Sequence, residues 1–125
     1  MNNLIIDTTG EIIFLKIISE NIEYNIKHEN CRENFDELVK IIFNFLNQNN
    51  INLSKNDNVF INQGPGKYTS IRSAISIAKA LRISKKVNIY GFDNSHISNN
   101  NYNILLKLSG EGRLTKDFIQ PKYLN

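Results

Sequence analysis

Three apolar segments open the chain, and their patterns predict three β-strands. Residues 4–6 are a short apolar run that ends at Asp7. Residues 12–18 are almost entirely apolar and β-branched, which is typical of a central strand covered on both faces. Residues 22–27 alternate between apolar and polar, which indicates a half-exposed strand nearer an edge. Because the turns between them are short, we expect an antiparallel meander.

The period then changes to that of a helix. Apolar residues recur every three or four positions from Phe35 to Leu46, and Asn49 marks the end of the pattern. Asn34 and Glu37 have the spacing of a capping box, so we expect them to begin the helix.

The middle of the chain alternates between strands and helices. We predict a strand at residues 57–61, a second helix at 68–83 and a further strand at 87–90. The resulting order, β-β-β-α-β-α-β, is typical of an α/β ribonuclease H-like lobe with a mixed five-stranded sheet.

The last part of the chain departs from this regular alternation. After a polar loop, residues 104–108 could form a strand, and a glycine turn would return the chain through 113–119. Pro121 blocks a helix, which favours an extended tail. We therefore divide the chain into an N-terminal lobe, residues 1–95, and a shortened C-terminal remnant, residues 96–125.

The two predicted helices carry more apolar surface than one side of a sheet hides. On the second helix, two neighbouring stripes span an arc of roughly 220°. The first stripe is Ile71, Ala74, Ile75, Ala78 and Leu81, and the second is Ser70, Ser73, Ile77, Ala80 and Ser84. Ile41 and Phe43 widen the face of the first helix in the same way. Either the helices pack on each other or under the C-terminal segment, or they meet a helical partner.

The partner interpretation assigns contacts to specific side chains. They are Ile41, Phe45, Ser70, Ser73, Ala74, Ile77, Ala80 and Leu81. Most are small or aliphatic, which lets another helix come close.

A glycine turn precedes the second helix. Gly64-Pro65-Gly66 lies between a strand and a helix, where α/β folds place ligands. Lys67 adds a positive charge at the positive end of the helix dipole, which is unfavourable unless an anion or acidic group lies nearby. Two interpretations stay open: the turn only aims the helix, or it contacts an anion or a partner.

Common catalytic and nucleotide motifs do not fit. A Walker A loop would need other residues than Ile61 and Tyr68, and a dinucleotide fingerprint would need glycine in place of Thr69. Asp7 lacks the further carboxylates of a two-metal nuclease, so a structural role is favoured over a lone metal ligand. His28 and Cys31 are spaced like half of a zinc site without the other half. We expect no catalytic residue, no metal and no cofactor.

The amino-acid composition restricts the class of protein and its cellular compartment. The 125 residues are 41% hydrophobic, which suits one globular unit, and the net charge of +3 permits contact with nucleic acid without demanding it. A single cysteine excludes an internal disulfide and favours a reducing cytoplasm. No signal peptide or membrane-spanning run is expected. The many asparagines match an A/T-rich codon bias, so their number does not indicate a functional site.

Several segments resemble the TsaB family, also called YeaZ. The clearest reads Gly64-Pro65-Gly66-Lys67-Tyr68-Thr69-Ser70-Ile71-Arg72 and is similar to the family's Gly-Pro-Gly-Ser-Phe-Thr-Gly-Ile-Arg. From this match, the family-motif turn and helix start comprise Gly64, Pro65, Gly66, Lys67, Thr69 and Arg72. The opening strand, residues 78–81 and Pro121-Lys122-Tyr123-Leu124 resemble other family segments. Lys67, Tyr68 and Ser70 replace the usual Ser, Phe and Gly.

The resemblance implies an actin-like, ribonuclease H-like fold and a non-catalytic role. TsaB binds the catalytic paralogue TsaD through the two helices of its N-terminal lobe, and the TsaE ATPase joins this complex. The complex forms N6-threonylcarbamoyladenosine in tRNAs that read ANN codons, so contact with tRNA would be indirect. TsaB also pairs with itself through the same helices. The alternatives are a homodimeric or degenerate binding protein, and a minimal metal-dependent nuclease.

Overall fold

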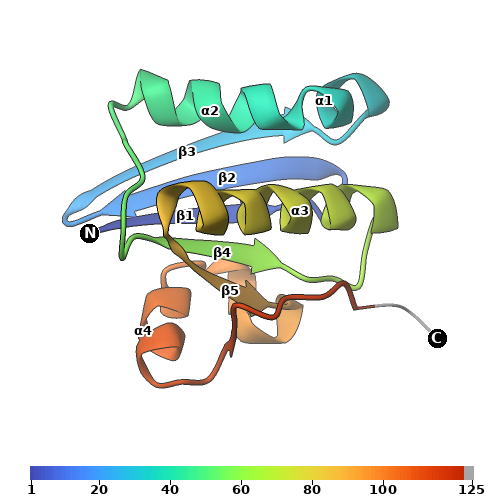
Figure 1. Cartoon of the computed structure of the whole chain (residues 1–125). Helices are drawn as coiled ribbons and strands as arrows, with labels where there is room; N and C mark the ends of the chain where they lie inside the picture. The colour runs from blue at the N-terminus through green and yellow to red at the C-terminus, as the bar shows by residue number, and fades with distance from the viewer. Residues whose placement is uncertain (123–125) are drawn as a thin grey trace.

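The computed structural model describes residues 1–122 and is built around one mixed β-sheet (Figure 1). Its strands are β1 (Asn2–Asp7), β2 (Ile12–Ser19), β3 (Ile22–Glu29), β4 (Asn58–Asn62), β5 (Asn88–Phe92) and β6 (Thr115–Lys116). Their order across the sheet is β3-β2-β1-β4-β5-β6. β1 to β3 form the predicted antiparallel meander, and β4 runs parallel to both β1 and β5. The predicted strand and helix order is confirmed, but the sheet has six strands rather than five.

Three helices cover one face of the sheet (Figure 1). They are α1 (Arg32–Asp36), α2 (Leu38–Gln48) and α3 (Tyr68–Lys85). The core between helices and sheet includes Leu4, Ile6, Leu15, Ile17, Ile42, Phe45, Ala74 and Ala78. Each large aliphatic side chain fully buried here contributes about 1.5–3 kcal/mol, so this core fixes α2 and α3 on the sheet.

A smaller layer lies against the opposite face. It consists of two short 3-10 turns, η1 (Asn94–His96) and η2 (Ser98–Asn100), and of α4 (Ile104–Gly110). These segments bury a second core that includes Ile5, Ile18, Phe60, Phe92, Tyr102, Leu105, Leu108 and Leu114. The rings of Phe14 and Tyr102 stack with centroids 4.6 Å apart. Both faces of the central strands are therefore covered.

The strand predicted at residues 104–108 is wrong, because this segment is the helix α4. The buried residues Leu105 and Leu108 are three positions apart, which matches a helix that packs one side onto the sheet. The predicted return strand at 113–119 is reduced to β6.

The first predicted helix is divided into two, and its predicted capping box does not form. α1 ends at Asp36, and the backbone of the next residue, Glu37 (φ −101°, ψ 13°), leaves the helical region before α2 begins. The Asn34 side-chain amide instead donates to the carbonyl of Glu29, 2.8 Å away. Asn34 thus ties α1 to the end of β3.

After β6 the chain passes to the other side of the sheet. Ile119 is fully buried in the core beneath the helices, whereas Leu114 belongs to the opposite core. The Arg82 guanidinium lies 3.3 Å from the Asp117 carboxylate and links α3 to this segment. The domain boundary predicted at residue 95 stays a prediction. No helix within residues 1–122 is both long and apolar enough to cross a bilayer.

Candidate functional site

The glycine turn connects β4 to α3 and admits no larger residue at Gly64. Gly64 has φ +99°, a conformation that other residues rarely adopt. A Cβ atom there would lie 2.9 Å from Ile71 Cδ1 and 3.1 Å from the carbonyl oxygen of Lys122. The Asn62 side-chain oxygen accepts from the Gly64 amide at 3.0 Å. Close packing therefore explains why glycine is needed at this position.

The same turn is docked on the turn between β1 and β2. A Cβ atom on Gly66 would lie 2.3 Å from the carbonyl oxygen of Thr9. The Lys67 amide donates to that oxygen at 3.0 Å. The direction of α3 is thus set by backbone contact between two turns that are distant in sequence.

Asn30 joins these turns to the end of β3. Its side-chain amide donates to the carbonyls of Thr8 and Gly10, at 3.0 and 2.8 Å. Its side-chain oxygen accepts from the Ser70 hydroxyl at 3.2 Å, in the first turn of α3. Asn30 is only 8% exposed, so these bonds are largely shielded from water.

The Lys67 side chain forms an ion pair with an acidic residue of the same chain, Glu11. Its ammonium lies 3.4 Å from the Glu11 carboxylate and donates to the carbonyl of Asn30 at 3.2 Å. The Glu11 side chain is 90% exposed, so the pair is weak, but it offsets the charge at the start of α3. The interpretation that the turn aims a helix therefore gains support, because no external anion is needed.

Asp7 ends β1 with its carboxylate fully engaged. One oxygen accepts from the amide and hydroxyl of Thr9, at 3.1 and 2.8 Å. The other accepts from the Asn62 side-chain amide at 3.1 Å and the Tyr102 hydroxyl at 2.7 Å. Burial, and then the nearby Asp7 charge, raise the pKa of Tyr102 above its ordinary value. Four donors saturate a carboxylate, so the geometry favours a structural role for Asp7 over a metal ligand.

The segment before the C-terminus holds the glycine turn from the other side. The Lys122 amide donates to the carbonyl of Gln63 at 2.8 Å, and the Gln63 side chain donates to the carbonyl of Gln120 at 3.1 Å. The Lys122 ammonium pairs with the Asp93 carboxylate after β5. Burial opposes ionisation of Asp93, but hydrogen bonds from Lys122 and Ser95 outweigh it and lower the pKa of Asp93 to about 2. Tyr123 and Leu124, which complete the tail motif, lie outside the described residues.

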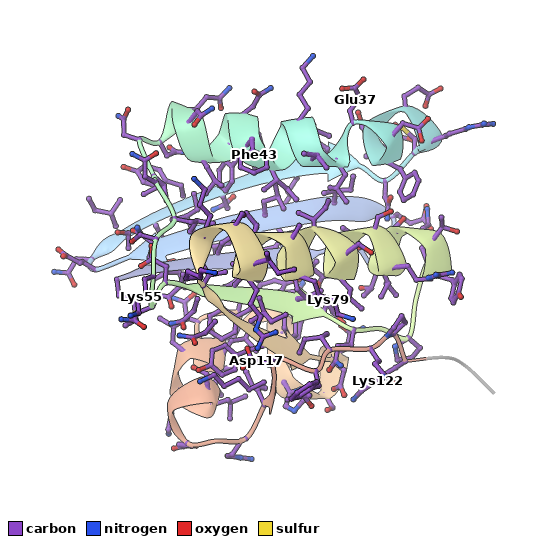
Figure 2. The ribbon with its side chains drawn as sticks, viewed as in Figure 1. Glu37, Phe43, Lys55, Lys79, Asp117 and Lys122 are labelled. Atoms are coloured by element: carbon purple, nitrogen blue, oxygen red, sulfur yellow. The ribbon has the colours of Figure 1, made fainter. Side chains whose placement is uncertain are left out.

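A groove of about 630 Å³, called the α2–α3 groove below, lies between α3 and the segment in which α1 passes into α2. Its lining residues are Phe35, Asp36, Leu38, Val39, Tyr68, Thr69, Arg72, Ser73, Ser76 and Ile77. Val39 is 52% exposed and Tyr68 46%. Phe43, 37% exposed, projects from α2 on the side of α3 (Figure 2). Exposed apolar side chains that flank an open groove are characteristic of a surface used for association.

At one end of the groove, α3 presents its first two turns. The Arg72 guanidinium donates to the Tyr68 hydroxyl at 3.1 Å and lies 5.3 Å from the centre of its ring. Thr69 and Arg72 of the family motif therefore reach the groove, whereas Gly64 and Gly66 are not among its lining residues.

The residues predicted to meet a partner fall into two groups. The buried ones, at most 6% exposed, are Phe45, Ser70, Ala74 and Leu81. The half-buried or exposed ones are Ile41, Ser73, Ile77 and Ala80. The first group packs within this chain, so a surface for a partner is restricted to the second group. That surface stays a prediction.

Sequence reasoning missed several residues that organise this region. Asn30, Gln63 and Tyr102 each bridge segments that are far apart in the chain. Within residues 1–122, no group of three or more His, Cys, Asp or Glu side chains is placed to hold a metal ion. The expectations of no metal and no cofactor remain predictions.

Two sequence comparisons assign the chain to a family. The family model described as TsaD, tRNA N6-adenosine threonylcarbamoyltransferase, matches residues 18–110. The tRNA threonylcarbamoyladenosine biosynthesis protein TsaB of Buchnera aphidicola subsp. Schizaphis graminum (strain Sg) is 33% identical over 89 residues. The chain belongs to the TsaB (YeaZ) family. The resemblance of residues 64–72 to the TsaB motif was therefore a correct guide.

Solved structures agree with a TsaB fold. YeaZ from Pseudomonas aeruginosa superposes with a TM-score of 0.67 at 21% identity, over 74% of this chain and 43% of that chain. A second structure from that organism, of an uncharacterized protein with similarity to peptidase YEAZ, gives the same values. The predicted α/β lobe is thus confirmed as YeaZ-like. The chain spans 42% of the Buchnera TsaB and 43% of YeaZ.

Proposed function

We propose that this chain is a non-catalytic subunit in the formation of N6-threonylcarbamoyladenosine in tRNA. The Buchnera relative is named for the biosynthesis of this modified nucleoside, which supports the assignment. In this proposal the chain works in the cytoplasm and touches tRNA only through its partner.

The α2–α3 groove is the observation that carries the proposal. Its rim joins the exposed Val39 of α2 to the half-buried Ser73 and Ile77 of α3. Small side chains let the helices of another subunit approach closely, and the apolar rim supplies surface to bury. A TsaD-like threonylcarbamoyltransferase is the proposed occupant, and a TsaE-like ATPase would join the pair.

A catalytic role for the chain alone is less well supported. The Asp7 carboxylate already accepts four hydrogen bonds, so a metal there would have to displace Thr9, Asn62 or Tyr102. A metal-dependent nuclease would also need further carboxylates beside it.

The direct test is binding to the TsaD-like protein of the same cell, measured by calorimetry with purified components. We expect Ser76→Glu and Ala80→Glu to weaken binding at least tenfold, because each places a charge on or beside the groove. Both side chains are exposed, so neither substitution disturbs the core. Lys79→Glu is the control: it places the same residue on α3, at a position that is neither in the groove lining nor among the predicted partner contacts (Figure 2).

A second assay, of threonylcarbamoyl transfer, tests the proposed function separately from the proposed binding surface. Threonylcarbamoyl transfer to tRNA by the TsaD-like enzyme should require this chain and should fail with Ala80→Glu. Wild-type affinity in both groove variants would overturn the proposed surface. Transfer at full rate without the chain would overturn the proposed function.

A further inference from the structure

One edge of the sheet is formed by a strand that has a neighbour on one side only. β3 pairs with β2 through all of its residues, from Ile22 to Glu29, and ends the strand order of the described sheet. Ile22, Glu23, Asn25, Lys27 and Glu29 are exposed. A regular edge of this length displays a row of unpaired backbone groups, which is a template for another strand.

The phase of the β2–β3 ladder fixes which residues offer those groups. The Asn30 amide donates to the carbonyl of Glu11 at 2.8 Å, and a two-residue turn joins Ser19 to Ile22. In an antiparallel ladder the hydrogen-bonded pairs alternate with pairs that direct their backbone groups away. The even-numbered residues of β3 therefore bond to β2, and Glu23, Asn25 and Lys27 direct their amides and carbonyls outward.

We propose that β3 pairs antiparallel with the β3 of a second copy of this chain, about a two-fold axis at Asn25. In this register each Glu23 lies opposite Lys27 of the other copy, and the two Asn25 residues face each other. The outward groups of the three residues then form about six backbone hydrogen bonds across the axis. The sheet becomes continuous through both copies.

Charge selects this register over its neighbours. A shift of the two-fold axis to Ile26 would place Glu23 opposite Glu29 twice, which is repulsive. A shift to Tyr24 would oppose Glu23 with Asn25 and leave both charges without an opposite partner. Lys27 takes part in no ion pair within residues 1–122. The Glu23 carboxylate lies 2.9 Å from Lys16 and accepts from the Asn103 side-chain amide at 3.0 Å, but the Glu23 side chain remains 45% exposed. Both groups are thus available to the second copy.

The other face of β3 is also self-complementary in this register. Tyr24 lies opposite Ile26 of the second copy, and Ile22 lies opposite His28. Aromatic and β-branched residues are favourable cross-strand pairs. Ile22, 53% exposed in the single chain, would gain cover. This contact lies on the opposite side of α2 from the α2–α3 groove, so it is independent of the proposed partner surface.

Sedimentation velocity over a concentration series tests the pairing. Wild type should shift from monomer to dimer, and Lys27→Glu or Glu23→Lys alone should weaken the dimer at least tenfold. An equimolar mixture of the two variants should restore it, because the mixed pair again has opposite charges at both positions. Asn25→Pro, which removes an outward amide and no bond to β2, should also give a monomer.

Two results would overturn the proposal. One is a wild-type chain that stays monomeric up to about 1 mM. The other is a dimer that the single charge variants leave intact or the mixture does not restore. Lys107→Glu on α4 is the matched control and should leave the dimer unchanged, and circular dichroism should show that every variant keeps the fold.

Discussion

Single polar residues, rather than apolar ones, determine how the segments around the glycine turn are joined. Asn30 satisfies two carbonyls of the β1–β2 turn and a hydroxyl of α3, while Asp7 receives donors from three other residues. A buried carbonyl without a donor costs free energy, so each of these side chains stabilises contacts that hydrophobic packing leaves open. The position of α3 thus depends on a few hydrogen bonds.

Replacing Asn30 tests this dependence. Asn30→Ala leaves the carbonyls of Thr8 and Gly10 without their side-chain donor and should lower the free energy of unfolding by about 2 kcal/mol or more. Urea denaturation measures the loss. Asn44→Ala on the exposed side of α2 should change stability by less than about 0.5 kcal/mol. Equal effects of the two substitutions would contradict the role given to Asn30.

A methyl group added at Gly66 should force the glycine turn away from the β1–β2 turn. Gly66→Ala would force the new Cβ against the carbonyl of Thr9 and should destabilise the fold by about 1–3 kcal/mol. Gly10→Ala is the control, because no atom lies within 4 Å of its Cβ position. Thermal unfolding compares the two, and an unaltered melting temperature for Gly66→Ala would show that the turns are not in contact.

At the scale of the elements, the segment from Leu114 to Lys122 contacts both hydrophobic cores, the helix α3 and the end of β4. It passes from one core to the other, pairs with α3 through Asp117, and bonds to Gln63 at the end of β4. The glycine turn therefore lies between the β1–β2 turn on one side and Lys122 on the other. Its geometry is maintained by elements from both ends of the chain.

The pH dependence of stability reports on this segment. The pKa of Asp93 is lowered in the folded chain from 3.8 to about 2, so its pairing stabilises the fold above about pH 4 and is lost as the pH falls towards 2. Lys122→Ala should return the pKa of Asp93 towards 3.8. The difference in free energy of unfolding between the wild type and Lys122→Ala should therefore shrink as the pH falls from about 4 towards 2.

Urea denaturation between pH 2 and 5, and NMR titration of Asp93, measure these effects over the range in which carboxylates titrate, about one unit either side of their pKa values. Lys79→Ala, an exposed substitution on α3, should show no such window. A titration of Asp93 near 3.8 in the wild type would contradict the pairing with Lys122.

At the scale of the whole molecule, the two proposed association surfaces lie on different sides of α2. The groove faces α3, whereas the β3 edge lies at the outer margin of the sheet. A molecule built in this way can meet two neighbours at once, because neither surface uses a residue of the other.

This separation predicts independent mutational effects. Lys27→Glu should lose the dimer formed through β3 and keep its affinity for the TsaD-like partner, whereas Ser76→Glu should do the opposite. Sedimentation and calorimetry on the same two variants give both readouts. If either variant lost both self-association and partner binding, the two surfaces would be coupled.

Part of the fold and the site followed from local patterns. Alternation in residues 22–27 placed β3 near an edge, and periodicity located the start of α3 at Tyr68. The same reasoning failed for residues 104–108, since a short apolar run fits a strand or a helix equally well. It also missed Asn30, because the sequence does not distinguish an asparagine at the site from the many others. Only its contacts in the folded chain identify it.

The sequence by itself determined the order of elements, the family through the glycine motif, and the apolar excess on the two helices, because these depend on residues close together in the chain. Only the tertiary structure decided which of those apolar residues remain exposed, that Glu11 lies beside Lys67, and that Asn30 and Tyr102 complete the site. These features arise from contacts between segments that are far apart in sequence, and periodicity carries no information about them.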